Sequence, residues 1–385
     1  MPHSEFLSSN DSKTLAAGIL QRAWLPAGYT SPNLGVYPWQ WMWDSCFHSI
    51  VWAWLDDQRA VTELESVFAL QGEDGFVPHM GYQMDPGAAN ALWGREGAST
   101  ITQPPMFGHA LRLLAESGLP VSEALIDKSE NALEFLWSRR RDTEGFVRVV
   151  HPWESGCDDS ARWDAWIGMP GRPFPKPAWD VRKRELLSAL EPGVSGGAVA
   201  NGEFSVQAAS FNALAAFNAL ELAAVTGSAL WKSRGTELAE ILDSRWSDEH
   251  QTWVDGDHAS GAADTLEALL PVLVLPERAP AVMRGIDARF ATAYGPAQTA
   301  LDAPTFEPAS YWRGPVWPHL AYLLWHAARR RGDLEGSVRI ARPTVEGARV
   351  SGLAEYWNPE TGAGLGAVPQ SWTALCLLME GVEPE

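Results

Sequence analysis

The stretch FNALAAFNALELAAVTGSALWKSRGTELAEILDSRW, residues 211–246, has the pattern of two helices joined by a tight turn. Within 211–225 the apolar side chains recur at helical spacing. Gly227 is the residue type that commonly ends a helix, and Ser228 is a type that commonly caps the next one. The stretch therefore predicts a helical hairpin.

Two further turns repeat this punctuation: Gly118-Leu119-Pro120 precedes Ser122, and Gly332 precedes Asp333. Tight turns within pairs and longer loops between pairs favour an all-α fold, an (α/α)6 barrel whose long loops form a cleft at one end of the ring. No linker or composition shift divides the chain, so we expect one domain over 1–385. The twelve helices are expected near residues 11–25, 44–56, 58–70, 102–117, 121–141, 205–226, 229–246, 262–273, 280–292, 314–331, 333–350 and 369–380.

Two segments depart from the helical pattern. FVRVVHPW (146–153) alternates in the manner of a strand and predicts a short hairpin element. Residues 164–203 are rich in Pro and Gly and form the longest irregular segment. A loop of this length in a compact domain is usually functional, so we expect a lid over the cleft, with a disordered insertion as the alternative.

Composition restricts the class of partner. The formal net charge is −19, which argues against binding to nucleic acid or to an anionic membrane surface and suits an enzyme with a small-molecule substrate. The three cysteines do not make a disulfide framework, which favours a reducing, cytoplasmic location. We see no signal peptide and no apolar run of membrane-spanning length.

Tryptophan is unusually frequent, with 20 residues against 13 Phe and 7 Tyr. Core packing accounts for most of them. Several nevertheless lie among polar residues, where flat rings beside carboxylates and amides are typical of sugar binding. These stretches are YPWQWMWD (37–44), HPWESG (151–156), RWDAW (162–166), YWRGPVWPH (311–319) and EYWNPE (355–360).

The common catalytic motifs are missing from the sequence. It has no G-x-S-x-G elbow, no phosphate-binding loop, no dinucleotide fingerprint and no metal-ligand spacing, so we predict neither a cofactor nor a metal. Carboxylates among aromatic residues remain, and hydrolysis of a glycosidic bond needs two of them.

One acidic motif is SGCDDSARWD (155–164). Side chains alternate in extended backbone, so we expect one of Asp158 and Asp159 to face the cleft and the other to brace the loop, with Arg162 paired to an acid. The best second carboxylate is Glu355, in GLAEYWNPETGAG (352–364).

Five blocks in this order resemble glycoside hydrolase family 63, whose members have (α/α)6 barrels. The blocks are YPWQWMWDSCFH (37–48), ITQPP (101–105), ESGCDDSARWD (154–164), YWRGPVW (311–317) and EYWNPETGAGLGAVPQSWTA (355–374). By size, and by its first block, the chain is most similar to the compact bacterial branch that hydrolyses mannosylglycerate or glucosylglycerate.

The resemblance implies an inverting α-glycosidase acting on a small α-glycoside. It assigns Asp158 as general acid and Glu355 as general base, with Asp159 and Arg162 in support. Trp153 would wall the acid's pocket and raise its pKa by desolvation. The substrate-binding candidates are Tyr37, Trp39, Trp41, Trp43, Asp44, Gln103, Trp153, Arg162, Tyr311, Trp312 and Trp317.

Alternatives stay open for some of these residues. Asp44 could act as the N-cap of the 44–56 helix, and Gln103 could satisfy a helix N-terminus. His319 and Gln370 stand where the family usually has Asn and an aromatic residue.

The branch pairs an acidic aglycone with a basic residue after the acid motif, and the candidates here are Arg172, Lys176, Arg182, Lys183 and Arg184.

Other functions also stay open. A trehalase-like disaccharide hydrolase, a sugar epimerase or isomerase on the same barrel, and a non-catalytic sugar-binding protein remain alternatives, as does a homo-oligomeric state.

Overall fold

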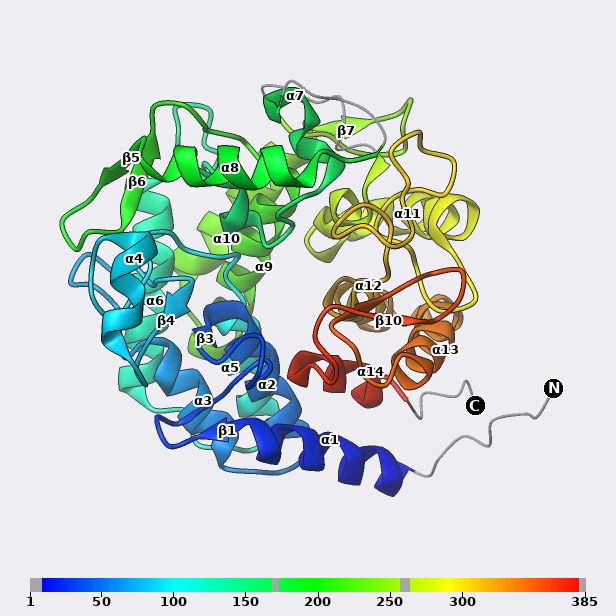
Figure 1. The fold of residues 1–385 in the computed structure, drawn as a ribbon, viewed down its shortest axis with the longest axis horizontal. Helices are drawn as coiled ribbons and strands as arrows, with labels where there is room; N and C mark the ends of the chain where they lie inside the picture. Colours follow the sequence, from blue (N-terminus) through cyan, green and yellow to red (C-terminus); the bar gives the residue numbers. More distant parts are fainter. Residues whose placement is uncertain (1–8, 168–172, 257–263, 381–385) are drawn as a thin grey trace.

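A computed structural model describes residues 9–167, 173–256 and 264–380. Its helices form a ring viewed end-on in Figure 1. Six inner elements each contact the next, and the last contacts the first, so the inner ring is closed. They are α2 (Met42–Trp54), α5 (Phe107–Glu116), α9 (Ala209–Thr226), the 3-10 helix η5 (Leu266–Leu273), α12 (Pro318–Arg330) and α14 (Ala374–Leu378).

An outer layer of helices packs against these inner elements. Its members are α1 (Ser9–Ala23), α3 (Arg59–Val67), α6 (Glu123–Arg139), α10 (Ala229–Asp243), α11 (Ala279–Gly285) and α13 (Leu334–Val350). Helix α1 packs on α14, so the first and last helices meet and complete the sixth pair (Figure 1). The prediction of an all-α (α/α)6 barrel is confirmed.

The predicted turn chemistry is also confirmed. Gly227 ends α9 with a φ of 72°, and the Ser228 hydroxyl accepts a hydrogen bond from the Trp231 N–H at 3.3 Å. Ser122 caps α6 in the same way. Asp333 caps α13. Each cap therefore satisfies one of the backbone donors that the helix leaves unpaired.

Each of the twelve predicted helices has a counterpart, although several bounds differ. The one expected over 262–273 is a 3-10 helix, with Pro271 inside it. The one expected over 280–292 continues α11 into a π-helical turn, Ile286–Phe290. The one expected over 369–380 is shorter, with a 3-10 turn, η8 (Ser371–Thr373), leading into α14. The expected hairpin element at 146–153 is present only as isolated antiparallel bridges, of Val147 with Arg141 across a tight turn and of Val149 with Val206, and not as a strand.

Residues 164–203 are more regular than expected. They contain α7 (Asp164–Ile167), α8 (Lys176–Leu187) and a hairpin of β5 (Leu190–Pro192) with β6 (Ala198–Asn201), while 168–172 lie outside the described residues. Proline is tolerated here because it falls in the first turn of α8. The prediction of an irregular segment is therefore wrong, and movement of a lid stays a prediction.

The remaining elements are short. One is α4 (Asn90–Trp93). The other strands form two-stranded antiparallel pairs: β1 (Trp24–Leu25) with β2 (Tyr29–Thr30), β3 (Gln40–Trp41) with β4 (Met80–Gly81), β7 (Trp246–Ser247) with β8 (Thr252–Trp253), and β9 (Tyr356–Trp357) with β10 (Gly364–Leu365).

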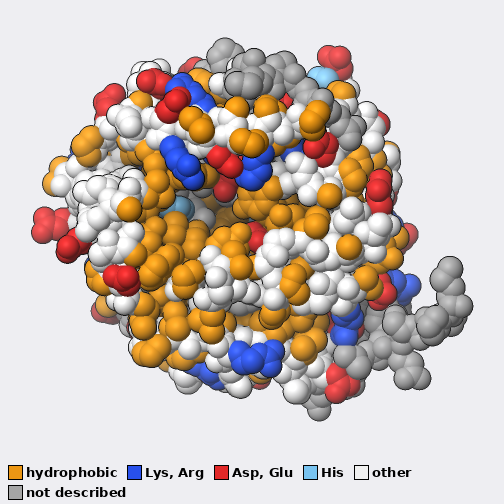
Figure 2. All heavy atoms as spheres, viewed as in Figure 1, with side chains coloured by type: hydrophobic (Ala, Val, Ile, Leu, Met, Phe, Trp, Pro, Cys, Tyr) orange, Lys and Arg blue, Asp and Glu red, His pale blue; other side chains and the backbone are white. Residues whose placement is uncertain are grey.

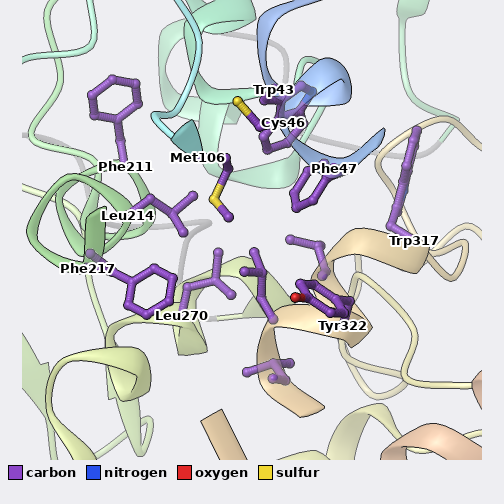
Figure 3. Close-up of a cluster of buried hydrophobic side chains, with 14 of the residues drawn as sticks. Trp43, Cys46, Phe47, Met106, Phe211, Leu214, Phe217, Leu270, Trp317 and Tyr322 are labelled. Atoms are coloured by element: carbon purple, nitrogen blue, oxygen red, sulfur yellow. The ribbon is translucent and has the colours of Figure 1, made fainter. Parts of the chain in front are cut away.

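Large apolar side chains fill the centre of the ring (Figure 3). A buried polar network crosses this core and ties α5, α9 and α12 together. His109 contacts Glu221 at 3.1 Å and the Tyr322 hydroxyl at 3.0 Å, and Arg330 pairs with Glu221. Helix α9 is long and apolar enough to cross a membrane by length and composition, but most of it is buried inside the barrel, as expected of a core helix.

Candidate active site

A cavity opens at the loop end of the ring, where the space-filling view shows a hollow with charged side chains at its rim (Figure 2). Both predicted catalytic carboxyls and seven of the predicted substrate-binding residues line it. The full lining is Pro32, Tyr37, Trp41, Trp43, Asp44, Gln103, Gly156, Asp158, Tyr311, Trp312, Glu355, Gln370 and Trp372. Segments distant in the sequence thus converge on one site.

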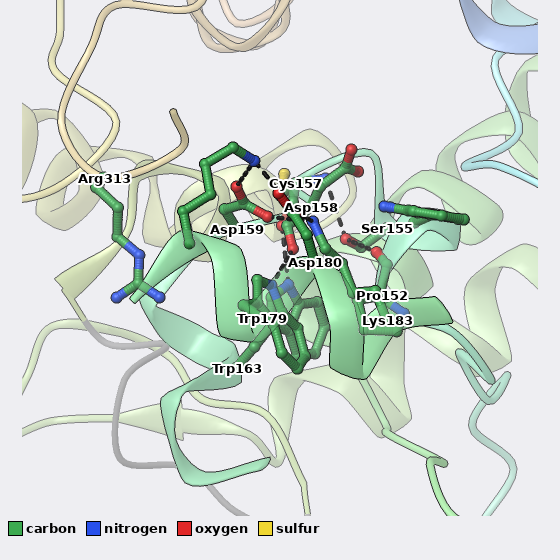
Figure 4. Close-up of polar contacts among 12 residues, drawn as sticks. Pro152, Ser155, Cys157, Asp158, Asp159, Trp163, Trp179, Asp180, Lys183 and Arg313 are labelled. Atoms are coloured by element: carbon green, nitrogen blue, oxygen red, sulfur yellow. Dashed lines mark hydrogen bonds and ion pairs between the residues drawn. The ribbon is translucent and has the colours of Figure 1, made fainter. Parts of the chain in front are cut away.

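The loop that carries Asp158 and Asp159, which we call the acid loop, follows the 3-10 turn η2 (Pro152–Ser155) and leads into η3 (Ala161–Trp163). Gly156 has a φ of 71°, and a Cβ there would lie 2.3 Å from the Trp43 ring, so only glycine lets the loop approach this wall. Two indole N–H groups hold the loop's carbonyls: Trp163 donates to Cys157 O at 2.8 Å, and Trp179 to Asp158 O at 3.0 Å (Figure 4).

The two adjacent aspartates point in different directions, as the alternation predicted. Asp158 lines the cavity, whereas Asp159 is buried against α8 and pairs with Lys183 at 2.5 Å and Lys176 at 2.8 Å. The pKa of Asp158 is raised to about 7, chiefly by burial; Lys183 and Lys176 oppose the rise, and the negative charges of Asp159 and Glu355 add to it.

Glu355 directly precedes β9 on the opposite wall. Its carboxylate accepts hydrogen bonds from the Tyr37 hydroxyl at 3.1 Å and the Ala367 N–H at 3.1 Å. Burial raises the pKa of Glu355 to about 7, and these two donors oppose the rise. Gly366 has a φ of 68°, and a Cβ there would lie 2.3 Å from Glu355 Oε2, so the turn fits closely around the carboxylate.

Two polar residues lie at the start of α2. The helix begins at Met42, so Asp44 lies within its first turn and the N-cap alternative is wrong. Burial and the charge of Glu355 raise the pKa of Asp44 well above its usual range. The Gln103 Oε1 accepts a hydrogen bond from the Trp43 N–H at 3.2 Å, so Gln103 both satisfies a helix N-terminus and lines the cavity.

Aromatic rings form another wall and the floor. Trp312 has a φ of 57° and stacks on Trp317 with ring centres 3.7 Å apart. A positive φ at so bulky a residue is strained, and such strain clusters at functional sites. His319 packs between Trp43 and Trp372, and burial lowers its pKa to about 3, so this ring is neutral.

Four predicted substrate-binding residues do not line this cavity: Trp39, Trp153, Arg162 and Trp317. Trp39 packs against Tyr82 in a small satellite core, and Trp317 is fully buried behind Trp312. Arg162 is also fully buried, and its guanidinium pairs with Asp255 at 3.0 Å. Arg162 therefore braces the acid loop. Gln370 and Trp372 were missed as site residues, although both lie in the last sequence block.

A second cavity of about 470 Å³ adjoins the first and shares Tyr37, Asp158 and Tyr311 with it. Trp153 lines this second cavity, which agrees with its predicted place beside the acid. The other lining residues are Leu92, Lys176, Asp180, Lys183, Arg184 and Tyr356.

Known proteins are similar to this chain in sequence and in fold. The family model "Mannosylglycerate hydrolase MGH1-like glycoside hydrolase domain" matches residues 37–373. Mannosylglycerate hydrolase MGH1 of Selaginella moellendorffii is 31% identical over 91% of this chain and 82% of its own length. Glucosylglycerate hydrolase of Mycolicibacterium hassiacum is 27% identical over 98% of this chain and 99% of its own length.

A solved structure is similar over almost the whole chain. It is the crystal structure of the family 63 mannosylglycerate hydrolase of Thermus thermophilus in complex with Tris and D-glycerate. The match has a TM-score of 0.81 and 27% identity, and it covers 96% of this chain and 99% of the other.

Proposed function

Because the chain belongs to the mannosylglycerate hydrolase MGH1-like members of glycoside hydrolase family 63, and is thus a glycoside hydrolase, we propose that it hydrolyses mannosylglycerate or glucosylglycerate with inversion. In this proposal Asp158 is the general acid and Glu355 is the general base.

One observation carries the assignment of roles. Asp158 lines both cavities, whereas Glu355 lines only the first. A glycosidic oxygen joins the sugar to its aglycone, so the acid has to lie where the two binding sites meet. The first cavity then receives the sugar and the second receives the aglycone.

The reaction follows from this arrangement. Asp158 donates its proton to the glycosidic oxygen as the bond from that oxygen to C1 breaks. A water oxygen bonds to C1 from the opposite face, and its proton passes to Glu355. The products are a β-sugar and glycerate with a free hydroxyl group. Proton exchange with solvent then restores the starting protonation of both carboxyls.

The environments of the two carboxyls support these roles. Tyr37 and the Ala367 N–H donate to Glu355 and favour its ionised form, as a base requires. Among the described residues no donor bonds to the Asp158 carboxyl to favour its ionised form, and burial is the largest influence on its pKa. The pKa values of both carboxyls are raised to about 7, so each can exchange a proton near neutral pH.

The basic residues of the second cavity favour an acidic aglycone. Lys176 and Lys183 are already paired with Asp159 and Asp180. Arg184 lines the cavity and is exposed, and no carboxylate of the described residues pairs with it. Its guanidinium is therefore available for the carboxylate of glycerate.

The other basic candidates are placed differently. Arg182 pairs with Glu203 and Glu185 and does not line the cavity. Arg172 lies outside the described residues.

Proton NMR of the enzyme with a panel of α-glycosides tests the proposal. The panel holds mannosylglycerate, glucosylglycerate, glucosylglycerol, trehalose, kojibiose and isomaltose. Early release of a β-sugar from a glycerate glycoside is expected. Release of an α-sugar would reject inversion, trehalose as the best substrate would favour the trehalase-like alternative, and conversion of a free sugar without hydrolysis would favour an isomerase.

Arg184→Met tests the aglycone site, with Arg182→Met as the matched control on the same helix. We expect Arg184→Met to raise the KM for the glycerate glycoside by about 10-fold or more and to leave glucosylglycerol unchanged. An equal change on both substrates would remove Arg184 from the aglycone site.

A further inference from the structure

We propose that Lys183 is a positioning residue for the general acid, because it holds the Asp158 loop against α8 through Asp159 (Figure 4). This inference rests on the acid role proposed above for Asp158.

Asp159 is the centre of a compact group of four charges. Its buried carboxylate contacts Lys183 at 2.5 Å and Lys176 at 2.8 Å. Asp180, which lies between the two lysines on α8, contacts Lys183 at 3.0 Å and Lys176 at 3.2 Å. The formal charges of this group sum to zero, and α8 supplies all of them except Asp159.

Helix α8 also holds Asp158 itself, since the Trp179 N–H donates to the Asp158 carbonyl. The carbonyl of one residue and the side chain of the next are thus fixed by the same helix. This leaves the Asp158 backbone little freedom to rotate. The direction of the Asp158 carboxyl, toward the junction of the two cavities, therefore depends on α8.

The two lysines contribute unequally. The Lys183 side chain is 3% exposed, whereas that of Lys176 is 47% exposed. Solvent screens an exposed pair, but loss of one partner of a buried pair leaves a charge without compensation. Lys183 is therefore the principal anchor of Asp159.

Lys183 also acts on the acid through its charge. Its removal takes away the cation that most strongly opposes the rise and leaves only the more exposed Lys176 paired with Asp159, so the pKa of Asp158 rises further. The acid works when protonated, so the alkaline limb of the pH–rate profile moves to higher pH. The other groups that act electrostatically with Asp158 are Lys176, Glu355, Tyr37, Tyr311 and Cys157.

The test compares two leaving groups in Lys183→Met. The substrates are the glycerate glycoside that the wild type prefers and the α-glycosyl fluoride of the same sugar. Fluoride leaves with little help from an acid, whereas glycerate needs its oxygen protonated. We expect kcat/KM to fall about 100-fold for the glycoside and less than about threefold for the fluoride.

Three further variants isolate the cause. Arg182→Met lies on the same helix outside both cavities and should match the wild type. Lys183→Arg keeps the charge and should recover part of the activity. Trp179→Phe removes the bond to the Asp158 carbonyl without leaving a buried charge, and it should show the same selective loss at about 10-fold even if Lys183→Met fails to fold.

The outcomes separate the two proposals. No turnover of any glycoside or fluoride by the wild type would reject the proposed function. Wild-type turnover with equal losses on both substrates, or no loss in Lys183→Met and Trp179→Phe, would reject only the positioning role.

Discussion

The loop that carries Asp158 and the turn that carries Glu355 line one cavity, yet they are held by different forces. Buried ion pairs anchor the acid loop at several points, through Lys183 to Asp159, Arg162 to Asp255 and Arg313 to Asp164. Within the parts of the chain that the structure describes, Glu355 pairs with no lysine or arginine. Its support comes from a phenol, a backbone N–H and a tight glycine turn.

This difference matches the two proposed tasks. An acid has to keep its proton until the bond breaks, and charges of both signs around Asp158 set the balance between its two forms. A base has to be ionised before reaction, and uncharged donors stabilise that form without an ion pair in competition with the attacking water. The comparison thus predicts that substitutions around Asp158 and substitutions around Glu355 change activity in different ways.

The largest expected effect comes from removing each carboxylate. Glu355→Gln should lower kcat by about 1,000-fold or more on both the glycoside and the glycosyl fluoride, because each needs an activated water. Asp158→Asn should lower kcat by a similar factor on the glycoside and by a far smaller factor on the fluoride. Steady-state kinetics on both substrates measure this, and equal losses in Asp158→Asn would contradict the assignment of the acid.

Glycine substitution gives an intermediate effect on the base side. In Gly366→Ala the new Cβ would contact Glu355 Oε2 at 2.3 Å, so the carboxylate has to move, and we expect kcat to fall about 10- to 100-fold. Gly352→Ala is the matched control, because its φ of 74° is similar but its Cβ meets nothing closer than Val368, at 3.5 Å.

Both glycine variants should lose about 1–2 kcal/mol of stability from backbone strain, measured by denaturant unfolding. Only Gly366→Ala should lose activity. An equal loss of activity in the two would show that strain, and not displacement of the carboxylate, is the cause.

The smallest expected effect is a shift in the pH dependence of kcat/KM. In Tyr37→Phe, Glu355 loses a donor that favours its ionised form, so its pKa rises. The base works when ionised, so the acidic limb of kcat/KM should move to higher pH by up to about one unit. The Lys183 variant should move the opposite limb. A shift of the alkaline limb by Tyr37→Phe would show that the two sides are not independent.

The barrel could be predicted from the sequence because its signals are local. The residues of three of the turns, a Gly followed by a capping Ser or Asp, and the 3.6-residue periodicity act within a few residues, and the twelve helices expected from such signals each have a counterpart. Helix α8 was missed because Pro175 and Pro177 suggested a loop, although proline fits the start of a helix. The 3-10 character of η5 depends on packing around Pro271 and could not be read from periodicity.

The site could be predicted only in part. The sequence blocks identified both carboxyls and most of the cavity wall. The pairing of Arg162 with an acid is confirmed, but its place among the substrate-binding residues is wrong, because its partner, Asp255, is 93 positions away and holds it outside the cavities. Trp39 and Trp317 carry the same residue type as the true wall residues, and only tertiary packing separates a core indole from one that faces the cavity.

The meeting of α1 with α14 has a consequence for how the enzyme is made. The N-terminal part of a chain leaves the ribosome first. The ring therefore stays open until residues 374–378 emerge and reach α1 and α2. Gln370 and Trp372, which complete the cavity wall, emerge just before them. A nascent chain therefore closes its core and completes the wall of the first cavity at the same stage of synthesis.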